Sequence, residues 1–188
     1  MPKLAIQLFL HACLLLLVMV VVGCAKWQDP PATTDSRLTN PYCNDPKAVN
    51  FNWGFPGKPD NTVCFYPTDL FTGTYIYTDS VYTSPDNYFL YYRIDTLHFI
   101  AQSQTKVAVT GFCLLRDTLR LTADKSYIAA VDTLIGDSTT NRGQYWCRIK
   151  DTVSGTILNS RLDTMLHVSF QIISDTGTTL HIGKAKKI

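Results

Sequence analysis

Short runs in which apolar and polar side chains alternate fill this chain from residue 70 onward. In the clearest run, 165–172, Leu, Val, Phe and Ile alternate with Met, His, Ser and Gln. Similar runs cover 71–78, 118–122 and 145–150, and residues that favour turns separate them. A period of two with one apolar face indicates β-strands. We therefore expect an all-β fold over 69–188, an antiparallel meander of about eight strands that forms a barrel or a sandwich.

The composition agrees with a β-rich chain. Every acidic residue is Asp and none is Glu, which removes a good helix former and leaves a residue that prefers turns and caps. The formal net charge is only +2, and no basic stripe runs along the sequence. We therefore expect no nucleic-acid partner.

The stretch 88–102 changes its alternation part-way. Up to Ile94 the apolar residues occupy even positions, and from Leu97 they occupy odd positions. Because a regular strand keeps each face constant, a bulge or tight turn is predicted near Asp95.

The first 23 residues have the layout of an export signal. Lys3 supplies positive charge, 8–22 is almost entirely apolar, and Gly23-Cys24 follows. A small residue directly before a cysteine, at the end of an apolar run, resembles the lipobox of bacterial lipoproteins. The resemblance implies that 1–23 is removed and that Cys24 receives the lipid. The alternative is an uncleaved transmembrane anchor, since roughly twenty apolar residues span a bilayer.

Residues 24–40 are rich in Pro, Thr, Ser, Asp and Gln, so we expect a flexible tether between the lipid and the folded part. Ala25 stands where an aspartate commonly retains lipoproteins in the inner membrane. The expected location is therefore the cell envelope, lipid-anchored in the outer membrane, facing the periplasm or the surface.

Residues 41–68 form a turn-rich stretch that Cys43 and Cys64 bound. Because disulfides persist outside the cytoplasm, we predict that these cysteines are paired, which stabilises the loop by roughly 3 kcal/mol. The pattern Cys-x-Asp-Pro-x-Ala-x-Asn-Phe from Cys43, with Asp-Asn-x-x-Cys-x-Tyr from Asp60, resembles short modules in secreted and surface proteins of Bacteroidota. Those modules usually carry Asp-Gly-Ser-Cys, from which this chain departs. The resemblance implies an extracytoplasmic location and the disulfide, and no activity.

Five side chains in this module offer oxygen ligands, so a calcium site is one hypothesis. They are Asp45, Asn50, Asn52, Asp60 and Asn61. Turn formation is the preferred interpretation, because EF-hand spacing and a bidentate Glu are absent. Trp53, Phe55 and Phe65 have two interpretations, a binding platform or, as we prefer, packing around the disulfide.

The β domain also resembles a known group. The segments 71–75, 109–112 and 153–157, the first with the pattern Phe-x-Gly-x-Tyr, are similar to small lipocalin-like β-barrel lipoproteins of Bacteroidota. This implies a shape and a location but no activity. Cys113 and Cys147 lie on strand-like segments, and a second disulfide is expected, with two buried free thiols as the alternative.

Motifs for catalysis are weak. Ser103 and Lys106 match Ser-x-x-Lys but lack the helix and companion motifs that this chemistry needs. If 175–177 forms a hairpin turn with a bulge glycine, His167 and His181 lie diagonally on the outer face, roughly 7–8 Å apart. We prefer two solvated histidines to a metal pair, because no carboxylate or thiol completes the set. We predict no catalytic residue, metal or cofactor.

The leading hypothesis for function is a non-enzymatic, lipid-anchored β domain that binds a small apolar ligand or an envelope protein. One alternative is a purely structural or partner-contact domain with a filled interior. A second alternative is a hydrolase whose site is assembled from dispersed Asp and His residues.

Overall fold

The computed structural model of the protein describes residues 35–113, 118–133, 144–145, 147 and 151–188, together with Gln7 and His11. The chain divides into two units, Met1–Thr39 and Asn40–Ile188, and η1 (Ser36–Thr39) ends the first. The export signal, Cys24 and the tether up to residue 34 lie outside the described residues, so they stay predictions. Within the described part of the chain, no helix is long and apolar enough to cross a membrane.

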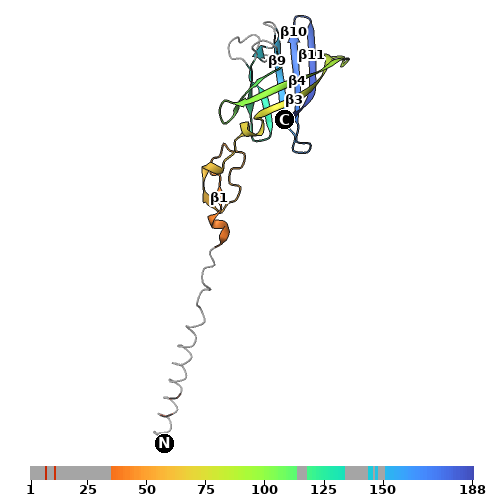
Figure 1. Ribbon diagram of the computed structural model, residues 1–188. Helices are drawn as coiled ribbons and strands as arrows, with labels where there is room; N and C mark the ends of the chain where they lie inside the picture. Colours follow the sequence, from red (N-terminus) through yellow and green to blue (C-terminus); the bar gives the residue numbers. More distant parts are fainter. Residues whose placement is uncertain are drawn as a thin grey trace. The chain divides into compact units, whose positions relative to one another are not determined.

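Among the described residues, eight antiparallel strands close into a barrel (Figure 1). They are β3 (Gly73–Ser84), β4 (Phe89–Ala101), β5 (Lys106–Thr110), β6 (Leu119–Ala123), β7 (Ile128–Val131), β9 (Thr152–Asn159), β10 (Leu166–Ser174) and β11 (Gly177–Lys187). Each pairs with its neighbour in the chain, and β11 returns to pair with β3. A two-residue strand, β8 (Gln144–Tyr145), pairs with the start of β9. The predicted meander is confirmed, and the pairing of β11 with β3 decides for a barrel over a sandwich.

Alternation in the sequence becomes the inside and outside of the barrel. In β10, the buried positions are Leu166, Val168, Phe170 and Ile172, and the residues between them are half-buried or exposed. Because closure leaves no edge in the ring, each inward residue meets the same interior.

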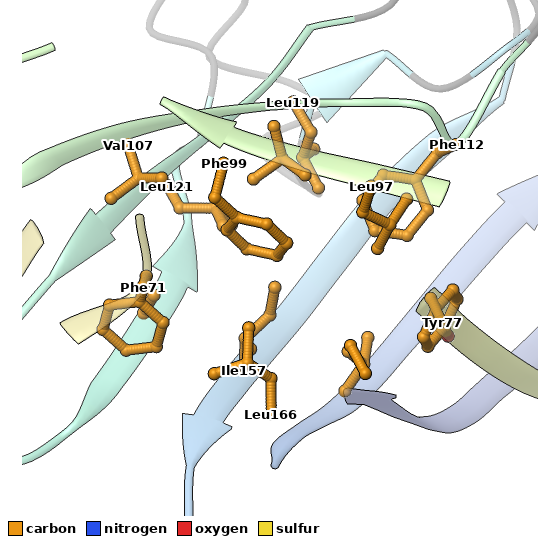
Figure 2. Packing of buried hydrophobic residues seen from close by; sticks show 14 of the residues in the cluster. Phe71, Tyr77, Leu97, Phe99, Val107, Phe112, Leu119, Leu121, Ile157 and Leu166 are labelled. Atoms are coloured by element: carbon orange, nitrogen blue, oxygen red, sulfur yellow. The ribbon is translucent and has the colours of Figure 1, made fainter. Parts of the chain in front are cut away.

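The interior has two ends, which we name for what lies there. The η3 end contains Gly73, Ala101 and Leu166, and is named for the short helix η3 (Pro67–Leu70) that precedes β3. The hairpin end contains the β3–β4 and β10–β11 turns. Phe71, which follows η3, is fully buried in the apolar core (Figure 2). Its companions include Leu97, Phe99, Val107, Leu121 and Ile157.

The predicted irregularity near Asp95 is wrong. β4 runs without a break from Phe89 to Ala101, and the register with β3 shifts between Val81 and Tyr82, which leaves Leu90 as the extra residue. Tyr92 and Ile94 are 68% and 61% exposed, so the apolar positions before Asp95 face outward. The inward positions there are charged, and this is why the apolar pattern changes parity although the strand does not.

The cysteine-bounded stretch folds as predicted around a Cys43–Cys64 disulfide with a Cα–Cα distance of 4.9 Å. Two short strands, β1 (Pro41–Tyr42) and β2 (Lys58–Pro59), pair in parallel, and η2 (Asn61–Val63) precedes Cys64. The Nζ atom of Lys125 donates a hydrogen bond to the Pro46 carbonyl at 2.8 Å.

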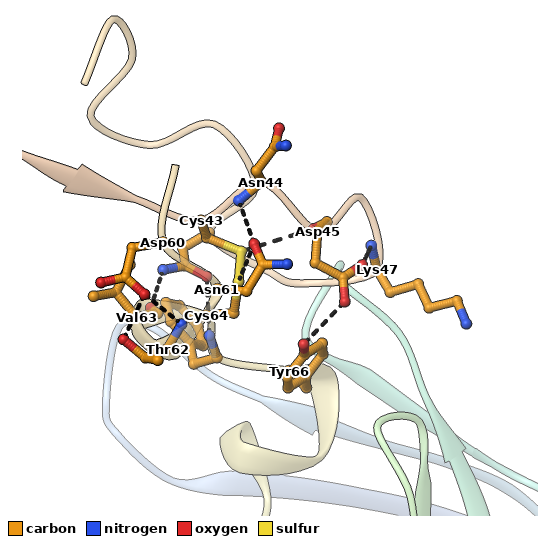
Figure 3. Close-up of a disulfide and its surroundings, with 12 residues drawn as sticks. Cys43, Asn44, Asp45, Lys47, Asp60, Asn61, Thr62, Val63, Cys64 and Tyr66 are labelled. Atoms are coloured by element: carbon orange, nitrogen blue, oxygen red, sulfur yellow. Dashed lines mark hydrogen bonds between the residues drawn. A yellow bond between two sulfur atoms is a disulfide. The ribbon is translucent and has the colours of Figure 1, made fainter. Parts of the chain in front are cut away.

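The Asp and Asn oxygens of this module support turns (Figure 3). Asp45 accepts from the Lys47 backbone N–H, Asp60 from that of Thr62, and the Asn61 side chain from that of Asn44. Asp45 and Asp60 thus cap local turns, and Asn61 joins two segments 17 residues apart.

The aromatic residues of the module do not pack as fully as predicted. Trp53 and Phe55 are 56% and 69% exposed. Trp53 makes an edge contact with Phe65 at 5.7 Å between ring centroids, and Phe55 makes one with Tyr42 at 5.9 Å. Each ring therefore packs on one side and faces solvent on the other.

The second predicted disulfide, Cys113–Cys147, is also present, with a Cα–Cα distance of 5.5 Å. Neither cysteine lies in a strand, because β5 ends at Thr110 and β8 at Tyr145. Residues 146 and 148–150 of the strand predicted there lie outside the described residues.

Candidate functional site

A group of charged and polar side chains occupies inward positions near the hairpin end. Asp79 on β3 lies opposite Arg93 on β4, and Tyr77 lies opposite Asp95. On the other side of β3, His181 of β11 lies opposite Val81, which is fully buried. Asp79, Arg93, Asp95, His181 and Tyr77 form what we call the interior polar cluster.

Asp79 is the centre of this cluster. Its Oδ2 atom accepts a hydrogen bond from His181 Nδ1 at 2.6 Å and another from Arg93 Nε at 3.2 Å. Arg93 Nε also lies 3.1 Å from Asp95 Oδ2. Because the single Nε–H is directed to Asp79, Asp95 has a charge contact with Arg93 but no hydrogen bond from that atom.

His181 extends the chain of contacts by one more step. Nδ1 contacts the carboxylate, and Nε2 lies 3.2 Å from the Thr179 hydroxyl, within hydrogen-bonding distance. The contacts therefore run from the Thr179 hydroxyl through the His181 imidazole to the Asp79 carboxylate. From there they continue through the Arg93 guanidinium to the Asp95 carboxylate.

The two carboxylates have opposite electrostatic environments. Burial disfavours the charged form of Asp79, but the hydrogen bond and charge of His181, with Tyr77 and Arg93, outweigh it and lower the pKa of Asp79. Burial raises the pKa of Asp95, and Arg93 offsets only part of this. Burial, followed by the nearby Asp79 charge, also raises the pKa of Tyr77, which stays a neutral phenol.

The cluster is incomplete as a hydrogen-bonding network. Arg93 Nη2 and Asp95 Oδ2 are buried and lack a hydrogen-bond partner in the part of the chain that the structure describes. The Tyr77 hydroxyl and the Asp79 carboxylate interact with each other. The Arg93 and Asp95 side chains are still 29% and 23% exposed, so solvent reaches part of the cluster.

A glycine in β11 makes room for this arrangement. A Cβ atom at Gly183 would lie 2.5 Å from Cε2 of Tyr77 and 2.3 Å from the Thr78 carbonyl oxygen. Any larger residue would push the phenol ring away from its position beside Asp79.

The prediction that His167 and His181 both lie on the outer face as solvated side chains is wrong for His181, which is 5% exposed. The β10–β11 turn has two residues between the paired Ser174 and Gly177, rather than a bulge glycine. The register therefore places His181 opposite the inward Phe170, and His167 opposite Lys184 on the outer face.

The two histidines meet different partners. His167 Nε2 contacts the Asp163 carboxylate at 2.7 Å. The His167 side chain also lines a groove of about 730 Å³ on the outside of the barrel. The carboxylate that was missing from the predicted histidine pair is thus present for each histidine separately, Asp163 for His167 and Asp79 for His181.

The Ser-x-x-Lys motif does not form a catalytic pair. Ser103 Oγ accepts from the backbone N–H groups of Thr105 and Lys106, as a turn cap. Lys106 Nζ contacts Asp132 at 2.7 Å and Thr122 at 2.6 Å. Within the described residues, no group of three His, Cys, Asp or Glu side chains is arranged to hold a metal ion.

One signal in the sequence pointed to the interior polar cluster. Tyr75, Tyr77, Asp79 and Val81 share one parity, so a charged residue stands in an apolar series. A charge at an inward position demands a partner. That signal does not identify the partners, because Arg93 and His181 lie on other strands.

Comparison with known proteins gives no family. No protein-family model matches the chain, and no curated protein matches it. Among solved structures, a redesigned β-barrel is similar over 66% of this chain and 96% of that chain, with 17% identity and a TM-score of 0.43. Nothing about ligand or activity follows from this likeness.

Proposed function

We propose that this protein is a lipid-anchored protein of the cell envelope whose barrel binds a small ligand at the interior polar cluster. The observation that carries the proposal is a charged cluster at inward positions in which Arg93 Nη2 and Asp95 Oδ2 lack a hydrogen-bond partner among the described residues, while 29% and 23% of these two side chains stay exposed. A buried donor or acceptor left unpaired costs about 1–3 kcal/mol, and more for charged groups. A polar ligand that enters at the exposed parts of Arg93 and Asp95 would supply the missing partners.

A purely structural role accounts for the cluster less well. A half-satisfied buried network is worse for stability than an apolar core. The remaining inward positions of the barrel, such as Leu119, Val153 and Ile172, are filled by apolar side chains. Asp95 is the clearest case, since its raised pKa means that the folded protein disfavours its charged form.

The ligand that this cluster favours is polar on at least one side. We first expected a small apolar ligand, but the apolar side chains of the interior pack against each other. The polar side of the ligand would contact β3, β4 and β11, which carry all five residues of the cluster.

Hydrolysis is the second candidate function. The specific observation in its favour is the order Thr179, His181 and Asp79, in which a hydroxyl, a base and a carboxylate are hydrogen-bonded in sequence. We rank ligand binding above hydrolysis because Arg93 and Asp95 would have no role in a hydrolytic site made of Thr179, His181 and Asp79. Turnover of p-nitrophenyl acetate that is lost in both Thr179→Val and His181→Gln would favour hydrolysis over binding alone.

The anchor is supported by the sequence alone. Gly23-Cys24 ends the apolar run of 8–22, and the following residues suit a tether. A disulfide in the cysteine-bounded module and a second one between segments that follow β5 and β8 agree with an oxidising compartment.

Intact mass of the protein extracted from its own membrane tests the anchor. We expect the denatured mass of 24–188 plus acyl chains, less four hydrogens for two disulfides. A mass that still includes Met1 would contradict the lipid anchor.

The native mass of the same preparation tests the ligand. We expect an additional component that is lost on denaturation, and that is also lost from Asp95→Asn. Asp175→Asn is the matched control, because Asp175 is exposed in the β10–β11 turn. A native mass without an added component in the wild type would count against ligand binding.

A further inference from the structure

The outward face of β3, β4 and β11 carries exposed apolar side chains. Four of them are more than half exposed, namely Phe89, Tyr92, Ile94 and Ile182, and Ile76 of β3 is exposed as well. We call these five residues the outer apolar face. A contiguous exposed apolar surface on a folded domain indicates contact with a partner protein or a membrane.

The strand register makes the outer apolar face continuous. Tyr92 of β4 and Ile182 of β11 lie in one row of the sheet, on either side of Ser80 of β3. Ile76 of β3 is the diagonal neighbour of Ile94 on β4. The exposed apolar side chains therefore extend across three neighbouring strands.

The charges of these three strands are divided between the two faces of the sheet. Their acidic residues are Asp79 and Asp95, and both point inward as members of the interior polar cluster. Lys184 and Lys186 of β11 stand on either side of the buried Ala185 and therefore point outward. The outer apolar face is thus bordered by positive charge, and these three strands contribute no negative charge to it.

A groove adjoins the outer apolar face. It has a volume of about 730 Å³, and its lining includes Tyr82, Leu158, His167, Ile182 and Lys184. Lys184 is 59% exposed there, although its Nζ atom lies 3.5 Å from the Asp163 carboxylate. Apolar side chains and an accessible lysine therefore share one depression of the surface.

These features fit a membrane surface that contains anionic phospholipid. Such a surface offers acyl chains to apolar side chains and phosphate groups to lysines. Tyrosine suits this environment, because its ring is apolar while its hydroxyl stays hydrated. The predicted tether, 24–40, spans at most about 60 Å, so the bilayer that holds the lipid is within reach.

We infer that the outer apolar face docks on the membrane that holds the lipid anchor. Tyr92, Ile94 and Ile182 enter the interface, and Lys184 and Lys186 meet lipid phosphates. An anchor on a flexible tether keeps the barrel near the bilayer without selecting a face, and the outer apolar face makes that selection. This inference rests on the lipid anchor of the proposed function and is independent of the interior ligand.

Quenching of a fluorescent label by nitroxide-labelled lipid tests this inference. The protein extracted from its own membrane, with Ile182→Cys carrying a nitrobenzoxadiazole dye, is reconstituted in vesicles of phosphatidylcholine and phosphatidylglycerol. Ala130→Cys is the matched control, because Ala130 is exposed on β7, across the barrel from β3. We expect quenching of the label at 182 to exceed that at 130 by at least about threefold. Equal quenching at the two positions would overturn the inference.

The role of the lysines has its own test. Lys184→Gln combined with Lys186→Gln should reduce quenching at position 182 at least about twofold in the same vesicles, and high salt should act in the same direction. Arg120→Gln is the matched control, because Arg120 is an exposed cation on β6. An equal reduction in the control variant would contradict charge contact by β11.

The remaining outcomes separate this inference from the proposed anchor. Energy transfer between copies labelled at position 182, without quenching by lipid, would assign the face to a second copy of the chain and overturn membrane docking. If the mass shows acyl chains on Cys24 and both labels are quenched alike, the docking face is wrong while the anchor stands. If the mass retains Met1 and neither label is quenched, both proposals fail.

Discussion

On β3 and β4, the inward side chains at the η3 end and those near the hairpin end are opposite in character. At the η3 end, Tyr75 of β3 and Phe99 of β4 pack edge to face, with 5.1 Å between ring centroids. A few residues further along the same two strands, Asp79 faces Arg93. The η3 end stabilises the fold by apolar burial, whereas near the hairpin end Asp79 is stabilised by its partners and charged Asp95 is not.

The packed η3 end therefore stabilises the barrel, and the interior polar cluster is the part proposed to bind a ligand. Close-packed apolar side chains leave no group unpaired, and they make the η3 end resistant to change in volume. The interior polar cluster retains unpaired groups, which a protein tolerates where function requires them. Variants at the two ends should therefore differ in the size and the sign of their effect on stability.

The largest effect is expected from Phe71→Ala at the η3 end. Phe71 is fully buried beside the apolar core, and truncation of a buried phenylalanine costs about 3–5 kcal/mol. Urea unfolding of the oxidised protein measures the loss. A change below about 1 kcal/mol would show that the η3 end does not hold the barrel together.

An intermediate effect is expected from Asp79→Asn. Arg93 and His181 lose a charged partner, and hydrogen bonds to charged groups contribute about 1.5–3 kcal/mol. Since the folded protein lowers the pKa of Asp79, the stabilisation is present above the ordinary value of 3.8 and is lost as pH falls through the lower folded-state pKa.

Unfolding measured between pH 7 and pH 3 tests the sign. The difference in free energy of unfolding between wild type and Asp79→Asn should be largest at pH 7 and should decrease below about pH 4. A gap that is constant over this range would mean that the carboxylate charge of Asp79 does not stabilise the cluster.

The smallest effect, of opposite sign, is expected from Asp95→Asn. Its pKa is raised in the folded state, so charged Asp95 reduces stability as pH rises above the ordinary value of 3.8. The variant should be as stable as the wild type or more stable at pH 7, by on the order of 1 kcal/mol, while it loses the ligand. A clear destabilisation would assign Asp95 a structural role and weaken the contrast between the ends.

Much of the fold was predictable because it depends on local pattern. The alternation at 165–172 gave β10 and its buried face, and the turn residues around 84–87 gave the β3–β4 connection. Both disulfides followed from the cysteine positions in a chain expected to be exported.

The site was not predictable, because small differences in register decide it. A two-residue turn at 175–176, in place of a bulge glycine, moves His181 from the outer face to the interior. The bulge at Leu90, in place of one near Asp95, leaves Arg93 and Asp95 inward and Tyr92 outward. Periodicity counts positions along one strand and contains no information on its partner.

The sequence by itself determined the strand content, the order of the segments and the cysteines available for pairing, because period, turn chemistry and residue type are local properties. Only the tertiary structure decided that β11 closes onto β3, and that Asp79, Arg93, Asp95 and His181 meet inside the barrel. These contacts join β3, β4 and β11, and Asp79 and His181 are 102 residues apart in the chain. Closure of the ring brings them together, and closure depends on the pairing of all eight strands at once.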